Sequence, residues 1–464
     1  MKPIHDPYND EKWIAGFAAE GGPRYLQIVK ALERAIADGS LQAGDRLPPQ
    51  RRLAEMLNID LTTVTRGFAE ARQRQLIEAR GTLGTFVAAP KVELTQSVDL
   101  SMNIPPPPAD VDMEALLRQG MSQVLMRTDT DLLMTYHLGG GSHADRSAWA
   151  QWLKPMLGRI DIERVVTCPG AQAALAALIL ALTQPGDVIL MEPLVYPGLP
   201  LAAEQLGRRV ETVAVDEFGM RPDSLEEACR KHNARLIYLN PTLQNPTTRT
   251  MPEQRRLEIV KVAARWNARI IEDDPYWLFA GHAPPPLARL MPEQVYYVST
   301  LSKCLSPGLR TAFVVLPDTQ AQHGFLSALR TFSLTSPLTS TLVTQWIHDG
   351  SAAQLLAGVQ TEARVRQRMV SGTFSGSTNS PEDHGIHAWL TLPSYWRALD
   401  LAAAARGDGL VIAPSAAFHS GRNPPNAIRV SLGGCRSRAE LEAALRKLSG
   451  LLAQKPPVQR ELVI

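Results

Sequence analysis

The sequence predicts a multidomain chain, in which a small and mainly helical N-terminal domain precedes a larger α/β domain. Its 464 residues exceed the roughly 250 to 300 residues at which a single hydrophobic core stops growing. Residues 1–88 carry three helical patterns and a hairpin pattern, and from Met113 onward helical segments alternate with short apolar segments. Such an alternation predicts a mostly parallel sheet covered by helices.

Three helices are expected in the N-terminal domain. Apolar residues at helical spacing predict the first helix over residues 25–36. Pro48-Pro49 can open the second helix, residues 50–57, because proline is tolerated in a first helical turn. Asp60 can cap the third helix, which is expected to reach about Gln75.

A hairpin is expected to complete this domain, with strands over residues 76–79 and 85–88 and two glycines in the turn between them. Three helices followed by such a hairpin form a winged helix-turn-helix, which places its third helix in the DNA major groove. Residues 24–88 hold ten Lys/Arg against seven Asp/Glu, and this net charge of +3 permits contact with a polyanion. The alternative is a protein-interaction module whose arginines are solvated surface charges.

Short apolar segments of the larger domain are expected to form strands. They are Ile160 to Cys168, Asp187 to Met191, Arg209 to Val215, Leu236 to Leu239, Arg269 to Glu272 and Val295 to Thr300. Residues 89–96 are expected to be a linker and residues 97–464 the larger domain, with a smaller C-terminal subdomain from about residue 345. The uncharged run 171–183 is shorter than the roughly 20 residues of a membrane-spanning helix, and we expect a buried helix there.

Composition is typical of a globular protein in a reducing compartment. The hydrophobic share is 45%, the charged share is 20% and the net charge is +2, which disfavours disorder. Residues 1–9 lack the features of a secretory signal, so we expect a cytoplasmic protein without a membrane partner. The four cysteines are scattered without a C-x-x-C pair, as expected of reduced thiols. His384 and His387 form an H-x-x-H pair, for which ordinary packing is expected rather than a metal site.

Two predicted strands lead into reactive side chains. The strand at residues 269–272 leads into three consecutive acids, Glu272, Asp273 and Asp274. Burying these acids is unfavourable unless a cation or hydrogen-bond donors compensate their charges. A protonated pyridine nitrogen would do so. The strand at residues 295–300 leads into Ser302-Lys303, which sets an amine near the strand ends, where ligands bind in open α/β sheets. A lysine in such a cleft can form a Schiff base.

The N-terminal domain resembles the DNA-binding domain of GntR-type regulators. The resemblance rests on the segment Gly44-Asp45-Arg46-Leu47-Pro48-Pro49-Gln50-Arg51, on Thr63-Val64, and on Gly81 with Gly84-Thr85-Phe86-Val87. It implies double-stranded DNA as a partner. The residues that it implies for DNA contact are Arg51, Thr62, Thr63 and Gly81, and Arg66 joins them because of its expected exposure.

The larger domain resembles the fold-type I aminotransferases, and the two domains together resemble the MocR group of regulators. The landmarks follow one another in the order Asn245, Asp273, Tyr276, Lys303, Arg310 and Arg429. The resemblance implies pyridoxal 5′-phosphate (PLP) as the cofactor, held as a Schiff base on Lys303, the catalytic residue. It also implies that Asp273 keeps the pyridine nitrogen protonated so that the ring is an electron sink.

The same resemblance assigns the remaining residues of the site. Asn245 and Tyr276 would bond the phenolic oxygen of PLP, Tyr196 would stack on its ring, and Arg429 would bind an effector or substrate carboxylate. The phosphate would lie at a helix N-terminus, where backbone N–H groups and the helix dipole favour anions. Its expected partners are Gly170, Ala171, Gln172, Thr300, Ser302 and Arg310, with Tyr136 contributed by the neighbouring subunit of a homodimer.

Each of these residues has an ordinary structural role as its alternative, such as a core aromatic, a turn residue or a salt-bridge partner. The sequence also departs from the common aminotransferase pattern, since Thr248 stands where many have glycine, Ala171 lacks a hydroxyl and Thr300 replaces a serine. The leading hypothesis is a PLP-dependent transcriptional regulator with little or no steady turnover, which senses an amino compound or PLP itself. The alternative is a metabolic aminotransferase with an accessory N-terminal domain.

Overall fold

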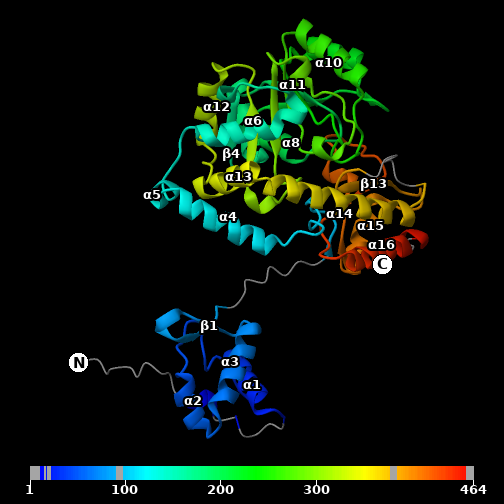
Figure 1. Cartoon of the computed structure of the whole chain (residues 1–464). Helices are drawn as coiled ribbons and strands as arrows, with labels where there is room; N and C mark the ends of the chain where they lie inside the picture. The colour runs from blue at the N-terminus through cyan, green and yellow to red at the C-terminus, as the bar shows by residue number, and fades with distance from the viewer. Residues whose placement is uncertain (1–10, 15–16, 18–21, 90–97, 377–383, 456–464) are drawn as a thin grey trace. The chain divides into compact units, whose positions relative to one another are not determined.

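The computed structural model describes residues 11–14, 17, 22–89, 98–376 and 384–455 (Figure 1). The chain divides into two compact units, Met1–Thr95 and Gln96–Ile464. Most of the predicted linker, residues 90–96, and the N-terminal residues 1–9 lie outside the described residues. Each unit is therefore considered by itself.

The smaller unit is the expected winged helix-turn-helix. Its elements are α1 (Arg24–Ala37), α2 (Gln50–Leu57), α3 (Leu61–Gln73), β1 (Ile77–Ala79) and β2 (Thr85–Val87). The Asp60 carboxylate caps α3 by accepting a 2.7 Å hydrogen bond from the Thr62 N–H. β1 and β2 pair in antiparallel register, with Ile77 opposite Val87, and apolar side chains of all three helices close the core beneath them.

Within residues 165–315, seven strands form one sheet in the order β4-β12-β11-β10-β9-β5-β6. Their bounds are β4 (Val165–Cys168), β5 (Val188–Met191), β6 (Arg209–Thr212), β9 (Leu236–Leu239), β10 (Arg269–Asp273), β11 (Val295–Thr300) and β12 (Ala312–Val315). β12 is antiparallel to both of its neighbours, whereas the other pairings are parallel. The mostly parallel α/β sheet is confirmed.

Helices cover both faces of this sheet. One face packs against α7 (Ala171–Leu182), α8 (Gly198–Gln205) and α12 (Ala321–Arg330). The other face packs against α6 (His143–Leu157), α9 (Pro222–His232), α10 (Glu253–Arg265), α11 (Leu287–Leu290) and α13 (Pro337–Asp349). α7 is the expected buried helix, since residues 174–179 are all buried. Among the described residues, no helix combines the length and the apolar character that crossing a membrane requires.

A smaller antiparallel sheet forms the C-terminal lobe, which α14 (Ser351–Thr373) joins to the rest of the unit. Its strands are β13 (His387–Thr391), β15 (Ala413–Pro414) and β16 (Ala427–Ser431), and α15 (Ala398–Gly407) and α16 (Arg438–Ala453) pack on them. The entry segment also belongs to this lobe, because β3 (Val98–Asp99) pairs with β14 (Leu410–Val411) and Leu100 is buried in its core. The expected start near residue 345 instead falls inside α13, whose Trp346 packs in the large core.

Two expected strands are shorter than predicted. In residues 160–168 the strand begins only at Val165, because Asp161 caps a 3-10 turn over Ile162–Arg164. In residues 209–215 the strand ends at Thr212. The chain then forms a separate small hairpin of β7 (Val215–Asp216) and β8 (Gly219–Met220). The apolar pattern of the sequence did not show that the first of these strands begins late or that the second ends early.

Candidate functional site

The candidate site lies where parallel strands of the large sheet end. Asp273 is the last residue of β10, and Lys303 follows the end of β11. Asn245 lies in the loop after β9, and Gly170 precedes α7 just after β4. Because the carboxyl ends of parallel strands meet at one edge of the sheet, the order β4-β12-β11-β10-β9 brings these residues together.

Asp273 is a buried carboxylate with one oxygen left open. Its Oδ2 accepts a 2.7 Å hydrogen bond from the Tyr238 hydroxyl, and its backbone carbonyl accepts one of 2.7 Å from Asn240 Nδ2. Its Oδ1 is buried and has no hydrogen-bond partner among the described residues. Burial raises the pKa of Asp273 to about 6, against the opposing effects of Tyr238 and Lys303. This oxygen can accept a bond from a cationic N–H group.

Lys303 is held with its amine pointing into the site. Its Nζ donates a 2.5 Å hydrogen bond to the Asn103 carbonyl. Burial lowers the pKa of Lys303 to about 8, the positive charges of Arg429 and Arg310 act in the same direction, and Asp273 opposes them. The amine therefore loses its proton more readily than an ordinary lysine, which is the condition for nucleophilic attack on a carbonyl.

Asn103 is a member of the site that the sequence did not reveal. Besides the contact with Lys303, its Nδ2 donates a 2.8 Å hydrogen bond to the hydroxyl of Tyr276 and lies 3.4 Å from His387 Nδ1. The His387 ring packs against Tyr276 at 5.5 Å between centroids, and burial lowers the pKa of His387 to about 3. In the described parts of the chain, no group of His, Cys, Asp and Glu suited to a metal is found.

Arg429 enters the site from β16 of the C-terminal lobe. Its Nη1 donates a 2.7 Å hydrogen bond to Asn245 Oδ1, and its Nη2 donates one to the Ser101 carbonyl. The guanidinium also stacks over the Phe418 ring, 4.6 Å from its centroid. Burial lowers the pKa of Arg429 to about 10. The hydrogen-bond partners of this buried cation are a carbonyl and an amide, and Asp99 acts on it electrostatically without a hydrogen bond, so a ligand carboxylate could form a direct ion pair with it.

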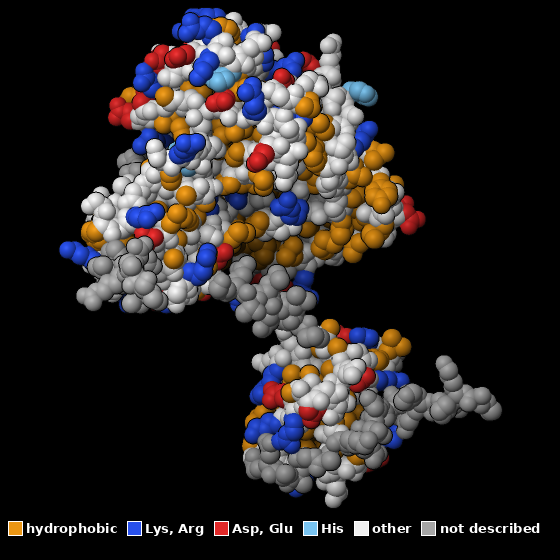
Figure 2. Space-filling model, turned by 180° about the vertical axis from the view of Figure 1, so that it is seen from behind, with side chains coloured by type: hydrophobic (Ala, Val, Ile, Leu, Met, Phe, Trp, Pro, Cys, Tyr) orange, Lys and Arg blue, Asp and Glu red, His pale blue; other side chains and the backbone are white. Residues whose placement is uncertain are grey.

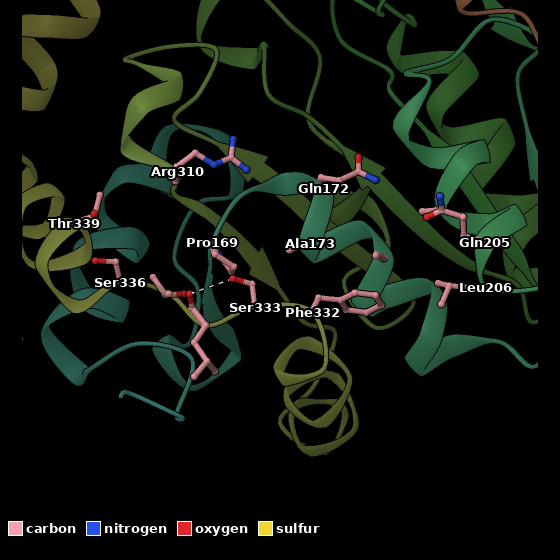
Figure 3. A pocket seen from close by; sticks show the side chains of 14 residues that line it. Pro169, Gln172, Ala173, Gln205, Leu206, Arg310, Phe332, Ser333, Ser336 and Thr339 are labelled. Carbon is pink, nitrogen blue, oxygen red and sulfur yellow. Dashed lines mark hydrogen bonds between the residues drawn. The ribbon is translucent and has the colours of Figure 1, made fainter. Parts of the chain in front are cut away.

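The remaining residues surround the N-terminus of α7. Gly170 precedes this helix with φ +121°, and a Cβ atom there would lie 2.7 Å from Arg310 Nη2. Arg310 and Gln172 line a cavity of about 580 Å³ that opens beside this terminus (Figure 3). Ala171 is the first helical residue, so its N–H is among those left unpaired by the helix.

Two hydroxyls and one aromatic ring complete this region. Thr300 Oγ1 lies 3.0 Å from Ser302 Oγ and accepts a 3.1 Å bond from the Ser302 N–H. Tyr196 is half-buried just before α8, and burial raises its pKa, with Asp273 adding to the rise and Arg310 opposing it. The ring thus lies within electrostatic reach of both the acid and the arginine.

Tyr136 is not brought to this site within a single chain. Its side chain is 84% exposed, in the segment between α5 (Thr130–Leu133) and α6. Other exposed apolar side chains lie close to it in the sequence, and Figure 2 shows such side chains gathered on the larger unit. The exposed apolar residues close to Tyr136 in the sequence are Leu125, Met126, Leu132, Met134 and Leu138.

The candidate DNA-contact residues lie on α2, α3 and the wing of the smaller unit. Arg51, Thr62 and Gly81 are exposed, and Thr63 is half-buried. Arg66 is exposed as well, but its guanidinium stacks over the Tyr25 ring at 4.1 Å from the centroid. A hydrogen bond also ties α3 to α2, since the Thr65 hydroxyl donates a 2.9 Å bond to Gln50 Oε1.

Of the departures from the common pattern, Thr248 has a structural consequence. It is buried with φ +62°, a left-handed conformation that costs a β-branched residue more than it costs glycine. Its N–H donates a 2.7 Å bond to the Gln244 carbonyl, which closes the loop that carries Asn245. The loop therefore keeps its turn although the residue is not glycine.

Comparisons with known proteins agree with this geometry. Residues 95–448 match the family model "Aminotransferase class I and II", and residues 24–87 match "Bacterial regulatory proteins, gntR family". The uncharacterized HTH-type transcriptional regulator YdeF of Bacillus subtilis is 30% identical, over 93% of this chain and 94% of that protein. The HTH-type pyridoxine biosynthesis transcriptional regulator PdxR of Corynebacterium glutamicum is 26% identical, over 78% of this chain and 82% of that protein.

Among solved structures, an archaeal alanine:glyoxylate aminotransferase covers 78% of this chain and 92% of its own, with a TM-score of 0.71 and 25% identity. The cofactor that this family and fold imply is PLP. The residues present fit it, because Asp273 keeps a buried oxygen open, Lys303 has a lowered pKa, and Gly170 leaves room beside Arg310.

Proposed function

We propose a regulatory function for this chain, which belongs to the MocR group, in which a gntR-family DNA-binding domain is joined to a domain of the class I and II aminotransferase family. In this proposal the larger domain holds PLP on Lys303 and senses an amino compound or PLP itself. The smaller domain binds double-stranded DNA, and the protein acts in the cytoplasm. The observation that carries the proposal is that one chain joins a gntR-family winged helix-turn-helix to a site whose buried Lys303 amine suits covalent attachment of an aldehyde.

Each polar group of the site has a part of PLP that it would hold. Asp273 Oδ1 would accept the pyridine N–H, and Asn245 and Tyr276 would bond the phenolic oxygen. The helix N-terminus at residues 170–172, together with Thr300, Ser302 and Arg310, would bind the phosphate, and Tyr196 would cover the ring. When bound, PLP supplies an aldehyde that condenses with amines and a ring that withdraws electrons.

An amine ligand would change the contacts of Lys303 and Arg429. It would compete with Lys303 for the aldehyde and so release the lysine amine. A ligand carboxylate would also compete with the bonds from Arg429 to Asn245 and Ser101, of which the bond to Asn245 ties the C-terminal lobe to the rest of the unit. Regulation then requires that the ligand bind two conformations of the protein with different affinities.

A homodimer with shared sites is part of the proposal. Its support is the exposed Tyr136 in an apolar stretch, because contiguous exposed apolar surface marks an interaction site. In a twofold dimer the same patch would face its copy, and Tyr136 of each chain could reach the phosphate held by the other.

The proposal is tested on the purified full-length protein incubated with PLP. We expect a visible absorption band that borohydride reduction abolishes, and a pyridoxyl adduct on the peptide that contains Lys303. The Lys303→Ala variant should lack the band and retain DNA binding, but its DNA affinity should no longer respond to an amine effector. An unchanged response in this variant would contradict the sensing mechanism, and a missing adduct would contradict the cofactor assignment.

The second candidate function is a metabolic aminotransferase. The observation that favours it is the same lowered pKa, since Lys303 could also carry the proton between substrate carbon and cofactor. Turnover discriminates the two candidates. Steady conversion of an amino donor with a keto-acid acceptor would favour the enzyme, whereas exchange or a single half-reaction would favour the sensor.

A further inference from the structure

A second cavity lies between the large sheet and the C-terminal lobe. Its volume is about 400 Å³, and the residues that line it differ from those around Lys303. One side comes from the loops that follow β5 and β9 and from the β7–β8 hairpin, and the other side comes from β13 and residues 419–427. Large apolar side chains contribute much of its walls, and they are Leu194, Val215, Phe218, Met251, Trp389 and Leu392.

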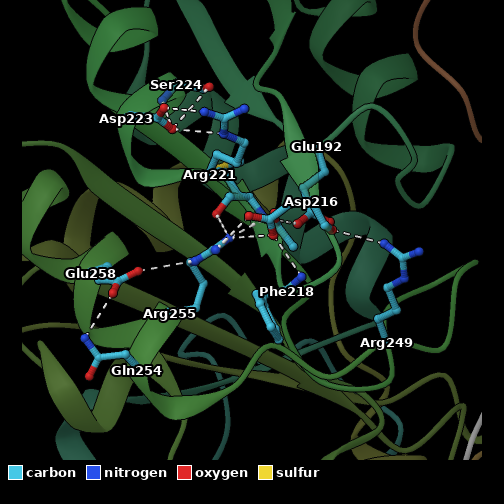
Figure 4. Close-up of polar contacts among 12 residues, drawn as sticks. Glu192, Asp216, Phe218, Arg221, Asp223, Ser224, Arg249, Gln254, Arg255 and Glu258 are labelled. Carbon is cyan, nitrogen blue, oxygen red and sulfur yellow. Dashed lines mark hydrogen bonds and ion pairs between the residues drawn. The ribbon is translucent and has the colours of Figure 1, made fainter.

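A buried carboxylate forms the polar part of this cavity. Glu192 Oε1 accepts a 2.9 Å hydrogen bond from the Met220 N–H, and its Oε2 accepts one of 3.3 Å from Gln244 Nε2. A carboxylate oxygen can accept about two hydrogen bonds, so each oxygen keeps room for one more donor. Arg249 attracts Glu192 electrostatically from the cavity wall (Figure 4), while its Nη1 donates a 3.1 Å hydrogen bond to the Asp216 carbonyl.

The burial of Glu192 favours a cationic ligand. Its side chain is 8% exposed, and this burial raises its pKa to about 7 against the effects of Met220, Arg249 and Gln244. A carboxylate in such surroundings is stabilised by any cation that reaches it. An ammonium group brings both the charge and the hydrogen-bond donors that the two oxygens can accept.

We propose that this cavity is a second small-molecule site, which binds an organic amine with its ammonium on Glu192 and its apolar body between Phe218 and Trp389. The two aromatic rings come from opposite sides of the cavity, and Trp389 is fixed by an edge-on contact with Phe418 at 6.4 Å between centroids. A planar or aliphatic body between such walls removes apolar surface from water, and the aromatic faces also attract a cation.

The second site adjoins the cofactor region through Asn240. This residue lines the cavity, donates from Nδ2 to the Asp273 carbonyl and accepts at Oδ1 from the Asn245 N–H, each at 2.7 Å. Gln244, which bonds Glu192, directly precedes Asn245 in the chain. On the proposed function above, on which this consequence rests, an amine in the second site would bias the position of Asn245 and hence the sensing of the first ligand.

The binding test uses a probe that cannot react with PLP. N,N-dimethyl-2-phenylethylamine is a tertiary amine, so its protonated form keeps one N–H donor but does not form a Schiff base. It is titrated calorimetrically into full-length protein that carries Lys303→Ala. We expect saturable binding to one site per chain and at least tenfold weaker binding in Glu192→Gln, since this variant loses a hydrogen bond between charged groups.

Matched variants separate the site from general effects. Glu114→Gln removes an exposed carboxylate that pairs with Arg118, outside the cavity, and should leave the affinity unchanged. Phe218→Ala removes a partly exposed wall and should weaken binding several-fold without disturbing the core. Absence of saturable binding, or equal affinity in Glu192→Gln, would each overturn the proposal. Because Lys303 is absent from this protein, these results do not depend on the proposed sensing mechanism.

Discussion

Arg429 Nη1 donates a 2.7 Å hydrogen bond to Asn245 Oδ1, across the boundary between the C-terminal lobe and the large sheet. The two residues were predicted for different parts of a ligand, one for a carboxylate and the other for the phenolic oxygen of PLP. If both predictions hold, this bond links the two roles, because a carboxylate that binds Arg429 at Nη1 would compete with the amide of Asn245. The proposed ligand contact and the position of the lobe would then be coupled through this one pair of atoms.

The first prediction concerns this arginine. Arg429→Gln should weaken binding of an amino acid to the PLP-loaded protein roughly ten- to a hundredfold, because a charged hydrogen-bond partner is lost. The corresponding amine, which has the same side chain but no carboxylate, should keep its affinity for this variant within about twofold. Spectroscopic titration of both ligands measures the difference. Arg364→Gln, which changes an exposed arginine of α14, is the control, and an equal loss for both ligands would contradict a carboxylate role.

The second prediction concerns pH. A lysine attacks PLP only as the free amine, so the rate of attachment should rise with pH to a plateau. The midpoint of this rise should lie near the Lys303 pKa of about 8, rather than near the ordinary value of 10.5. Stopped-flow absorbance on cofactor-free protein measures this profile. Arg429 lowers this pKa and Asp273 raises it, so Arg429→Gln should move the midpoint upward and Asp273→Asn downward. Shifts in the same direction would contradict the electrostatic account.

Much of the fold was predictable because it depends on local pattern. The strands β9 and β11 and the helix α2 have the bounds that apolar runs and turn residues indicate. The strand β12 was missed, since four apolar residues after a loop are too few to separate a strand from a buried turn. The pairing of β3 with β14 joins residues far apart in the chain, and a local sequence pattern cannot predict such a contact.

The candidate site was predictable where its residues belong to strand ends. Asp273 and Lys303 are marked by the buried strands before them, and the sheet order brings them together. Asn103 could not be recognised, because its partner Tyr276 lies 173 residues away and the segment around it forms no repeating pattern. Tyr238, which bonds Asp273, was hidden for a different reason, because an aromatic residue inside an apolar strand is expected to serve the core.

The third prediction concerns DNA binding. Arg51 is exposed near the start of α2, and its replacement by alanine should weaken binding to mixed-sequence duplex DNA and lower the salt dependence by about one counterion. Arg74→Ala is the matched control, because Arg74 already pairs with Glu70 at 2.8 Å and Glu33 at 3.2 Å. Fluorescence anisotropy at several salt concentrations measures both. Equal slopes for the wild type and Arg51→Ala would exclude a phosphate contact.

The last prediction separates the phosphate site from backbone strain. Gly170 and Gly186 both have positive φ, +121° and +91°, so alanine is strained at either position. A Cβ at Gly170 would also meet Arg310 Nη2 at 2.7 Å, whereas a Cβ at Gly186 meets nothing within 4 Å. Both variants should therefore lose some thermal stability. Only Gly170→Ala should also lose PLP affinity, roughly tenfold or more, because its methyl group displaces a charged donor from the phosphate. Equal PLP affinity in the two variants would contradict the assignment of the PLP phosphate to the N-terminus of α7.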